Sequence, residues 1–187
     1  MVGLPHEAAT PGPDPKMTPE DYFESQCAAM FAAERAAPSV IEGWDLPSSI
    51  TIDYIGMEAV IAQLPWGENG MDFGWRGLAC LKFRQPHVID FAIWYEGELC
   101  GLCCAFAWPN SGEICIEALQ ANPEPDHKLR GYIIQIARVV LAMYGKLVGA
   151  SVILVNQAEP GSEKAYRRSR FEPHDDGFAY VIPEGIQ

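Results

Sequence analysis

The chain has 187 residues, of which 49% are hydrophobic and 20% are charged, and its formal net charge is −12. This length and composition fit one globular domain with a sizeable core and exclude a disordered chain. The acidic balance disfavours nucleic-acid binding, which needs Lys and Arg, and suits a cationic partner. No apolar run reaches membrane-spanning length and residues 1–19 lack a signal-peptide pattern, which predicts a cytoplasmic protein with no membrane contact.

The six cysteines predict neither a metal site nor disulfides. Cys100 and Cys103 have C-x-x-C spacing, but no second ligand pair follows at a matching spacing, and the four histidines are scattered. Without a secretory signal, structural disulfides are not expected. We therefore interpret the cysteines of this segment as buried thiols in a strand and predict no metal.

The first half of the chain contains a tail followed by mostly helical segments. Prolines among Gly, Ala and charged residues predict a flexible tail over residues 1–17, so that residues 18–187 form a single domain. Thr18 is the predicted N-cap of a helix that fades near Pro38. The elements expected next are a loop at 38–49, a strand at 51–55, a helix at 57–64, a turn at 65–70 and a helix capped by Asp72 that runs to Phe83.

The second half alternates strands and helices. Two apolar runs, 88–95 and 98–108, flank Glu96-Gly97 and predict a β-hairpin. The elements expected after it are a turn at 109–112, a strand at 113–120, a loop at 122–128, a helix at 131–144 that Gly145 and Gly149 end, a strand at 151–155, a short helix at 160–169 and a last strand at 178–182. This order predicts an α/β domain.

From Asp90 onward the order of elements resembles the GNAT superfamily of acyl-CoA-dependent N-acyltransferases. In that family an Arg/Gln-x-x-Gly-x-Gly/Ala motif opens a helix whose backbone amides hold the coenzyme A pyrophosphate. The matching stretch here has Arg130 and Gly131 at the start of the motif, whereas the two later small positions carry Ile133 and Gln135. The resemblance therefore implies a cofactor site with an atypical motif at Leu129, Arg130, Gly131, Tyr132 and Ile133.

The resemblance also implies functional residues at the end of the chain. GNAT proteins often carry a Tyr five residues before the Phe of a Gly-Phe pair, where it protonates the departing thiolate. Tyr166 and Phe171 keep this spacing, and Arg170 replaces the Gly. Asn156 fits a family position that contacts the pantetheine arm. A packed aromatic on a short helix is the alternative interpretation of Tyr166.

The strand at 113–120 provides the remaining candidates. Its alternation puts Glu113, Cys115 and Glu117 on one face and Ile114, Ile116 and Ala118 on the other. A carboxylate here can take the proton of an amine acceptor, so Glu113 and Glu117 are candidate catalytic residues, with a solvated charge as the alternative for Glu113. The resemblance implies that backbone groups of Leu119, Gln120 and Ala121 bind the pantetheine and polarise the thioester.

The expected fold is thus a GNAT-like mixed, mostly antiparallel sheet flanked by helices, with splayed central strands. The expected function is transfer of an acetyl or other acyl group from acetyl-CoA to an amine, which is expected to be cationic, by direct attack in a ternary complex. The resemblance further implies that a homodimer can form. The alternative is a catalytically inactive GNAT-like module that binds a protein or small ligand, which the changes in the Gly motif favour.

Overall fold

The computed structural model describes residues 17–68, 73–78, 80–108 and 110–184. The predicted tail at 1–17 lies almost wholly outside the described residues, as do Asp72 and Pro109. Among the described residues, no helix combines the length and the apolar character needed to cross a lipid bilayer.

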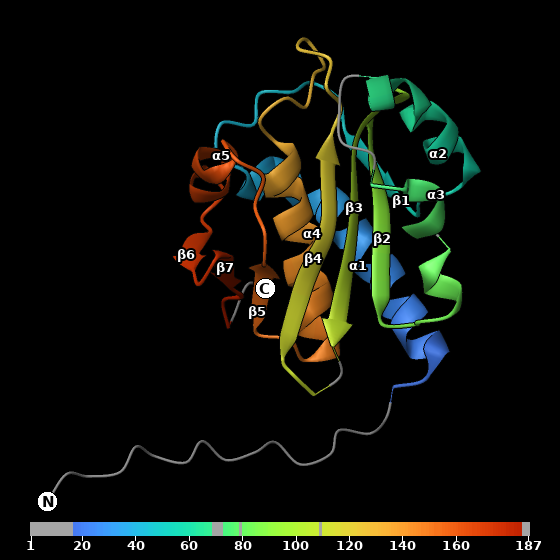
Figure 1. The fold of residues 1–187 in the computed structure, drawn as a ribbon, viewed down its shortest axis with the longest axis vertical. Helices are drawn as coiled ribbons and strands as arrows, with labels where there is room; N and C mark the ends of the chain where they lie inside the picture. The colour runs from blue at the N-terminus through green and yellow to red at the C-terminus, as the bar shows by residue number, and fades with distance from the viewer. Residues whose placement is uncertain (1–16, 69–72, 79, 109, 185–187) are drawn as a thin grey trace, which may run out of the picture.

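A seven-stranded sheet with the order β1-β2-β3-β4-β5-β7-β6 organises the domain (Figure 1). Its strands are β1 (Ile50–Asp53), β2 (Val88–Tyr95), β3 (Glu98–Trp108), β4 (Glu113–Ala121), β5 (Val152–Val155), β6 (Glu172–His174) and β7 (Gly177–Val181). Every neighbouring pair is antiparallel except β4 and β5, which run parallel. The predicted mixed, mostly antiparallel sheet is confirmed.

The predicted β2–β3 hairpin is confirmed, and its turn explains the sequence. Glu96 and Gly97 both have positive φ angles, 51° and 82°. Two-residue hairpin turns of this kind match the twist of the flanking strands and favour Gly at the second position. Tyr95 pairs with Glu98, so the two long apolar strands lie side by side.

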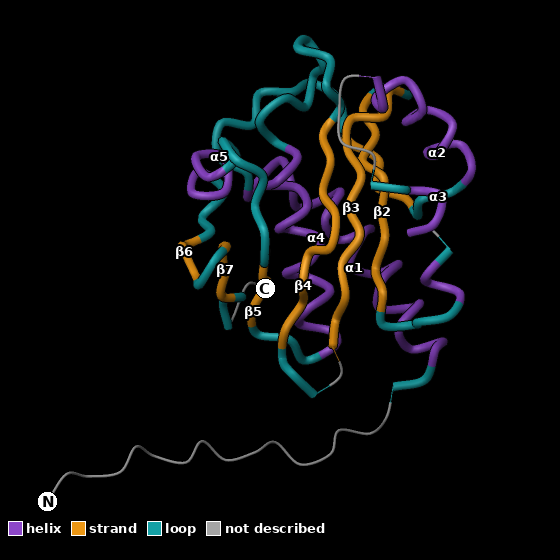
Figure 2. The backbone as a smooth tube through the Cα atoms, viewed as in Figure 1, coloured by secondary structure: helices purple, strands orange, loops and turns teal. Residues whose placement is uncertain are grey.

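The helices cover the two faces of the sheet unequally, as the tube in Figure 2 shows. They are α1 (Pro19–Val40), α2 (Met57–Gln63), α3 (Trp75–Leu78), α4 (Ile133–Val148) and α5 (Glu163–Arg168), with short 3₁₀ helices η1 (Leu64–Glu68) and η2 (Leu81–Phe83). Helices α1 and α4 pack together behind the strands in this view. The larger buried core lies between these two helices and the sheet. A smaller core lies on the opposite face, under α2 and α3.

Helix α1 begins where the sequence predicts and ends later. Thr18 and Asp21 form a capping box, in which the Thr18 hydroxyl accepts from the Asp21 amide at 3.2 Å. The prediction that the helix fades at Pro38 was wrong by two residues. A proline in the last turn removes one N–H donor, but Ala37 and Ile41 remain buried and the Ile41 amide still bonds to the Ala37 carbonyl at 3.0 Å.

The predicted bounds of α4 also need correction. Gly131 has a φ of 87°, which a right-handed helix cannot contain, so the helix starts at Ile133. Gly149 is the left-handed cap. Gly145 lies inside the helix, which runs to Val148. Only glycine fits at this position, because a Cβ there would stand 2.4 Å from Cδ1 of Ile182. Gly145 is therefore a packing residue and not a helix end.

One further prediction was wrong, and one short strand was missed. The expected helix from Asp72 to Phe83 is only two short pieces among the described residues, α3 and η2. Gly74 and Gly77 disfavour a continuous helix there. The large side chain of Trp75 is buried in the smaller core against the sheet. The short strand β6 was not predicted, because its three exposed residues, Glu172 to His174, carry no apolar alternation.

Candidate functional site

Strands β4 and β5 pair at their starts and then separate. Parallel pairing covers only Glu113 to Cys115 against Val152 to Leu154, although β4 continues to Ala121. A cavity of about 180 Å³ opens where the strands part. It is lined by Phe73, Ile116, Glu117, Ala118, Leu119, Ala121, Ile133, Ile134, Val155, Gln157, Glu159, Ser162 and Tyr166. Of the predicted site residues, the structure brings Glu117, Leu119, Ala121, Ile133 and Tyr166 together here.

Glu117 occupies an irregularity in β4. Ile116 pairs with Ala105 and Ala118 with Cys104, so Glu117 has no residue opposite it on β3. An inserted residue of this kind shifts the alternation of the strand. The predicted common face of Ile114, Ile116 and Ala118 is therefore wrong, because Ala118 belongs to the smaller core and the other two to the larger core.

Beyond this bulge, alternate backbone groups of β4 point toward the cavity. The Asn122 amide donates to the Cys100 carbonyl on β3 at 2.9 Å. Since backbone groups alternate direction along a strand, those of Leu119 and Ala121 point away from β3, toward the space between β4 and β5. Those of Gln120 point back to β3, and its side chain accepts a bond from Trp75 Nε1 at 2.5 Å. Gln120 does not line the cavity, whereas its two neighbours do.

The N-terminus of α4 forms the next part of the site. The first amides of a helix have no intrahelical acceptor, and among the described residues no side chain caps those of α4. The first turn carries no acidic residue. Of the predicted motif residues, Leu129 is fully buried in the core, while Arg130 is exposed and donates to the Pro125 carbonyl at 2.5 Å. These features leave a 16-residue helix with an open, positively polarised end.

The bulky residues of the motif point in different directions. The three nearest atoms to a Cβ placed at Gly101 all belong to Ile133, which shows that this side chain packs onto β3. Gln135 is buried and its amide donates to the Gly131 carbonyl at 3.3 Å. Tyr132 turns aside, with its hydroxyl donating to the Gly43 carbonyl and its ring against Trp44. Ile133 is therefore held against β3, whereas Gln135 is held against the Gly131 carbonyl just before the helix.

Tyr166 enters the cavity from α5. Only 7% of the residue is exposed, and its ring stacks on Phe178 at 5.2 Å and meets the edge of Phe171 at 5.5 Å. Burial raises the pKa of Tyr166 to about 12, with smaller contributions from Cys103 and Glu159. The phenol therefore stays protonated at any physiological pH and can donate a hydrogen bond to an anion that forms in the cavity.

The remaining predicted residues lie beside the cavity. Glu113 starts β4 and lies outside the lining, roughly 13 Å along the strand from Glu117. Cys115 lies between them, and its pKa is raised first by burial and then by the charges of Glu117 and Glu113. Asn156 is also absent from the lining, because its Nδ2 donates to the Cys115 thiol at 3.1 Å. Gln157, its neighbour, lines the cavity instead.

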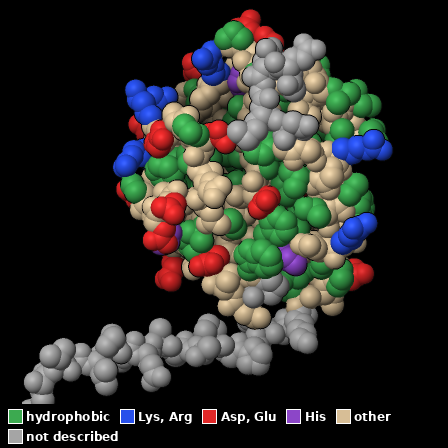
Figure 3. All heavy atoms as spheres, viewed as in Figure 1, with side chains coloured by type: hydrophobic (Ala, Val, Ile, Leu, Met, Phe, Trp, Pro, Cys, Tyr) green, Lys and Arg blue, Asp and Glu red, His purple; other side chains and the backbone are tan. Residues whose placement is uncertain are grey.

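An aromatic strip on the same sheet was not predicted from the sequence. Phe106 and Trp108 stack at 5.6 Å, and the His87 ring lies 5.6 Å from Trp108. Phe106 pairs with Cys115 and Trp108 with Glu113, so the strip runs beside the acidic residues of β4. Figure 3 shows hydrophobic side chains with scattered carboxylates across this face. The alternation of β3 puts Phe106 and Trp108 on one face, but only the β3–β4 register places them beside Glu113.

No protein-family model and no curated protein sequence matches the chain. Solved structures do match. The ribosomal-protein-S18-alanine N-acetyltransferase from Escherichia coli superposes with a TM-score of 0.53 at 12% identity over 73% of this chain and 96% of its own. AAC(6′)-Iy in complex with the bisubstrate analogue CoA-S-monomethyl-acetylneamine gives a TM-score of 0.51 at 15% identity, over 67% of this chain and 92% of its own.

A protein from Desulfovibrio desulfuricans assigned to the GNAT family gives a TM-score of 0.53 at 9% identity, over 72% of this chain and 98% of its own. The fold is that of the GNAT acetyltransferases. At these identities the similarity establishes the GNAT fold alone, and any chemical activity has to be argued from the residues of the site.

Proposed function

We propose that this GNAT-fold protein is an N-acyltransferase that moves an acetyl group from acetyl-CoA to an amine. The observation that carries the proposal is the cavity between β4 and β5, into which Tyr166 and Glu117 enter from different elements. Tyr166 is a phenol whose raised pKa keeps it protonated at neutral pH, and Glu117 is an exposed carboxylate, so the two can serve as hydrogen-bond donor and proton acceptor in acyl transfer to an amine.

The donor thioester would bind along the β4 side of the cavity. The α4 N-terminus supplies amides and a favourable dipole for the pyrophosphate. The outward backbone groups of Leu119 and Ala121 would bond the pantetheine amides as an added strand does. The anionic cofactor is thereby held by backbone groups, which is consistent with a site built in an acidic chain.

The acceptor would approach over the face that carries the aromatic strip of His87, Phe106 and Trp108. Aromatic faces and carboxylates both attract an ammonium group. Trp108 is 51% exposed and pairs with Glu113 across the strands, so the two side chains offer both attractions at one place. We therefore expect a cationic amine as the acceptor.

The chemical step has a simple balance. Glu117, directly or through water, first takes one proton from the bound ammonium. The neutral amine nitrogen then attacks the thioester carbonyl carbon, a C–N bond forms, and the C–S bond breaks. The second proton of the nitrogen leaves to solvent. Tyr166 donates a hydrogen bond to the departing thiolate. Because the pKa of Tyr166 is raised to about 12, this bond stabilises the thiolate more than it transfers a proton, and solvent completes the protonation.

Calorimetric titration with acetyl-CoA and coenzyme A tests the donor site first. We expect binding that weakens in Arg130→Glu, because a negative charge beside the helix N-terminus opposes the pyrophosphate. The matched control is Arg84→Glu, an exposed arginine next to η2. Absence of binding to both ligands would refute the proposal, and binding without turnover against a panel of amines would favour the inactive module.

The catalytic roles are tested by thiol release with an amine that turns over. We expect Tyr166→Phe and Glu117→Gln each to lower kcat by ~10²-fold or more, with little change in KM for acetyl-CoA. Tyr22→Phe and Glu58→Gln, both remote from the cavity, are the controls. Unchanged kcat in both site variants would contradict the assigned roles.

A further inference from the structure

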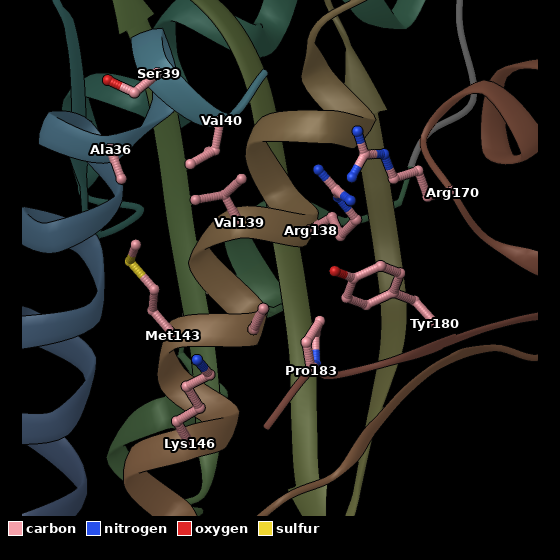
Figure 4. A pocket seen from close by; sticks show the side chains of 11 residues that line it. Ala36, Ser39, Val40, Arg138, Val139, Met143, Lys146, Arg170, Tyr180 and Pro183 are labelled. Atoms are coloured by element: carbon pink, nitrogen blue, oxygen red, sulfur yellow. The ribbon is translucent and has the colours of Figure 1, made fainter. Parts of the chain in front are cut away.

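A second, larger cavity lies farther along α4, toward the C-terminal end of that helix. Its volume is about 720 Å³, within the range of small-molecule sites. The C-terminal part of α1, the middle of α4 and β7 enclose it, and Figure 4 shows it from close by. Its lining residues are Ala36, Ser39, Val40, Arg138, Val139, Ala142, Met143, Lys146, Arg170, Tyr180 and Pro183. None of them lines the cavity between β4 and β5.

Arg138 is the unusual residue of this second cavity. It is 5% exposed, and its buried Nε has no hydrogen-bond partner in the described part of the chain. Its guanidinium lies 4.9 Å from the centre of the Tyr180 ring. Burial lowers the pKa of Arg138, and the charge of Arg170 lowers it further, whereas the charge of Tyr180 and a hydrogen bond with the Tyr180 side chain raise it. A buried cation of this kind is normally paired.

Arg170 supplies a second guanidinium under backbone strain. In Figure 4 the side chains of Arg138, Arg170 and Tyr180 point toward one another. Arg170 has a φ of 67°, a conformation that glycine adopts more readily. It also stands where GNAT proteins often carry a glycine. A strained position that nevertheless holds a long cationic side chain is a reason to ask what that side chain binds.

The rest of the lining matches the apolar body of a ligand. Lys146 adds a third cation, no Asp or Glu is among the lining residues, and most of the others are apolar. Although the chain has a formal net charge of −12, three cationic side chains line this one apolar cavity. A planar guanidinium fork suits carboxylate and phosphate oxygens.

We propose that this cavity binds a small organic anion with an apolar body, whose carboxylate or phosphate lies between Arg138 and Arg170. The apolar part then lies between α1 and α4, against Val139 and Met143. This site is separate from the acyl-transfer cavity, so the proposal stands whether or not the protein transfers acyl groups.

Calorimetric titration of the whole protein with octanoate, octyl phosphate and 1-octanol tests the proposal. We expect saturable binding of at least one anion with a Kd below about 1 mM, and at least tenfold weaker binding of the neutral alcohol. The two anions distinguish a carboxylate from a phosphate ligand. Inorganic phosphate alone is expected to bind more weakly than octyl phosphate, because it lacks the apolar body.

Two variants remove the proposed contacts without an obvious cost in folding. Arg170→Gly removes the guanidinium and relieves the positive φ, and Arg138→Met replaces a buried charge by an apolar side chain. Each is expected to weaken binding of the anion by about tenfold or more. Arg168→Gln, two residues from Arg170 and exposed, and Leu119→Ala in the other cavity are the controls.

Three results would overturn the proposal. These are no binding of either anion at millimolar concentration, equal binding of octanol, and unchanged binding in both arginine variants. Loss of binding in Leu119→Ala but not in Arg170→Gly would place the ligand in the acyl-transfer cavity and would equally refute it.

Discussion

Gly101→Ala tests how the sheet positions the N-terminus of α4. A Cβ at position 101 would lie 2.8 Å from Ile133 Cγ2 and 3.0 Å from Ile133 Cδ1, both well inside van der Waals contact. Gly101 has no positive φ, so the backbone accepts alanine without strain. The overpacking costs ~1–3 kcal/mol, and the smaller entropy of the unfolded alanine chain returns ~0.4–1 kcal/mol. We expect a net destabilisation of about 1–2 kcal/mol.

A double-mutant cycle separates this contact from other effects. Ile133→Ala removes all three atoms that the new methyl group would meet and alone costs ~2–5 kcal/mol. In the double variant the clash is absent and the methyl group fills part of the cavity. We therefore expect the double variant to be no less stable than Ile133→Ala, with a coupling energy of about 1–3 kcal/mol.

Urea unfolding measures these free energies, and coenzyme A titration of the same variants reports on the helix end. Gly77→Ala is the matched control, because no atom lies within 4 Å of its Cβ position and its φ is not positive. That variant should be neutral or slightly stabilised. Additive effects of the two substitutions, or an unperturbed Gly101→Ala, would refute the packing argument.

Three further predictions concern stability. Burial lowers the pKa of His127, so the unfolded chain takes up a proton at a higher pH than the folded chain does. The free energy of unfolding, measured with urea at several pH values, should therefore decrease below about pH 6.5 and should decrease less in His127→Gln. Burial raises the pKa of the Cys100 thiol to about 11, so the thiol ionises first in the unfolded chain and stability should fall between pH 9 and pH 11. Cys100→Ala should reduce that fall, and an unchanged pH dependence would contradict the prediction. Thr18→Ala removes the α1 cap and should cost ~0.5–2 kcal/mol by the same assay, and no loss would show that the capping box contributes little.

Local patterns predicted much of the fold. The Glu96-Gly97 turn predicted the β2–β3 hairpin, because both turn residues need positive φ and only some sequences allow it. Thr18 and Asp21 predicted the start of α1 through bonds made within one turn. One error lies where packing between distant segments decided. Gly145 signalled a helix end, yet the approach of Ile182 requires a glycine inside the helix.

The candidate site divides in the same way. The resemblance to GNAT proteins singled out Tyr166 and the alternation of the strand singled out Glu117, and the structure places both at one cavity. The sequence could not show that Gln120 points toward β3, that Asn156 binds the Cys115 thiol, or that Glu113 lies outside the cavity lining. These depend on the β4 bulge and on strand register, and both result from pairing with a strand elsewhere in the chain.

By itself, then, the sequence determined most of the long strands and helices, because turn geometry, capping and apolar alternation act over a few residues. Tertiary structure decided which face each side chain of β4 occupies and how far β4 and β5 stay paired. It alone brought Arg138, Arg170 and Tyr180 together from α4, the residues after α5, and β7. Such groupings depend on long-range packing, which contributes no periodic signal to the sequence.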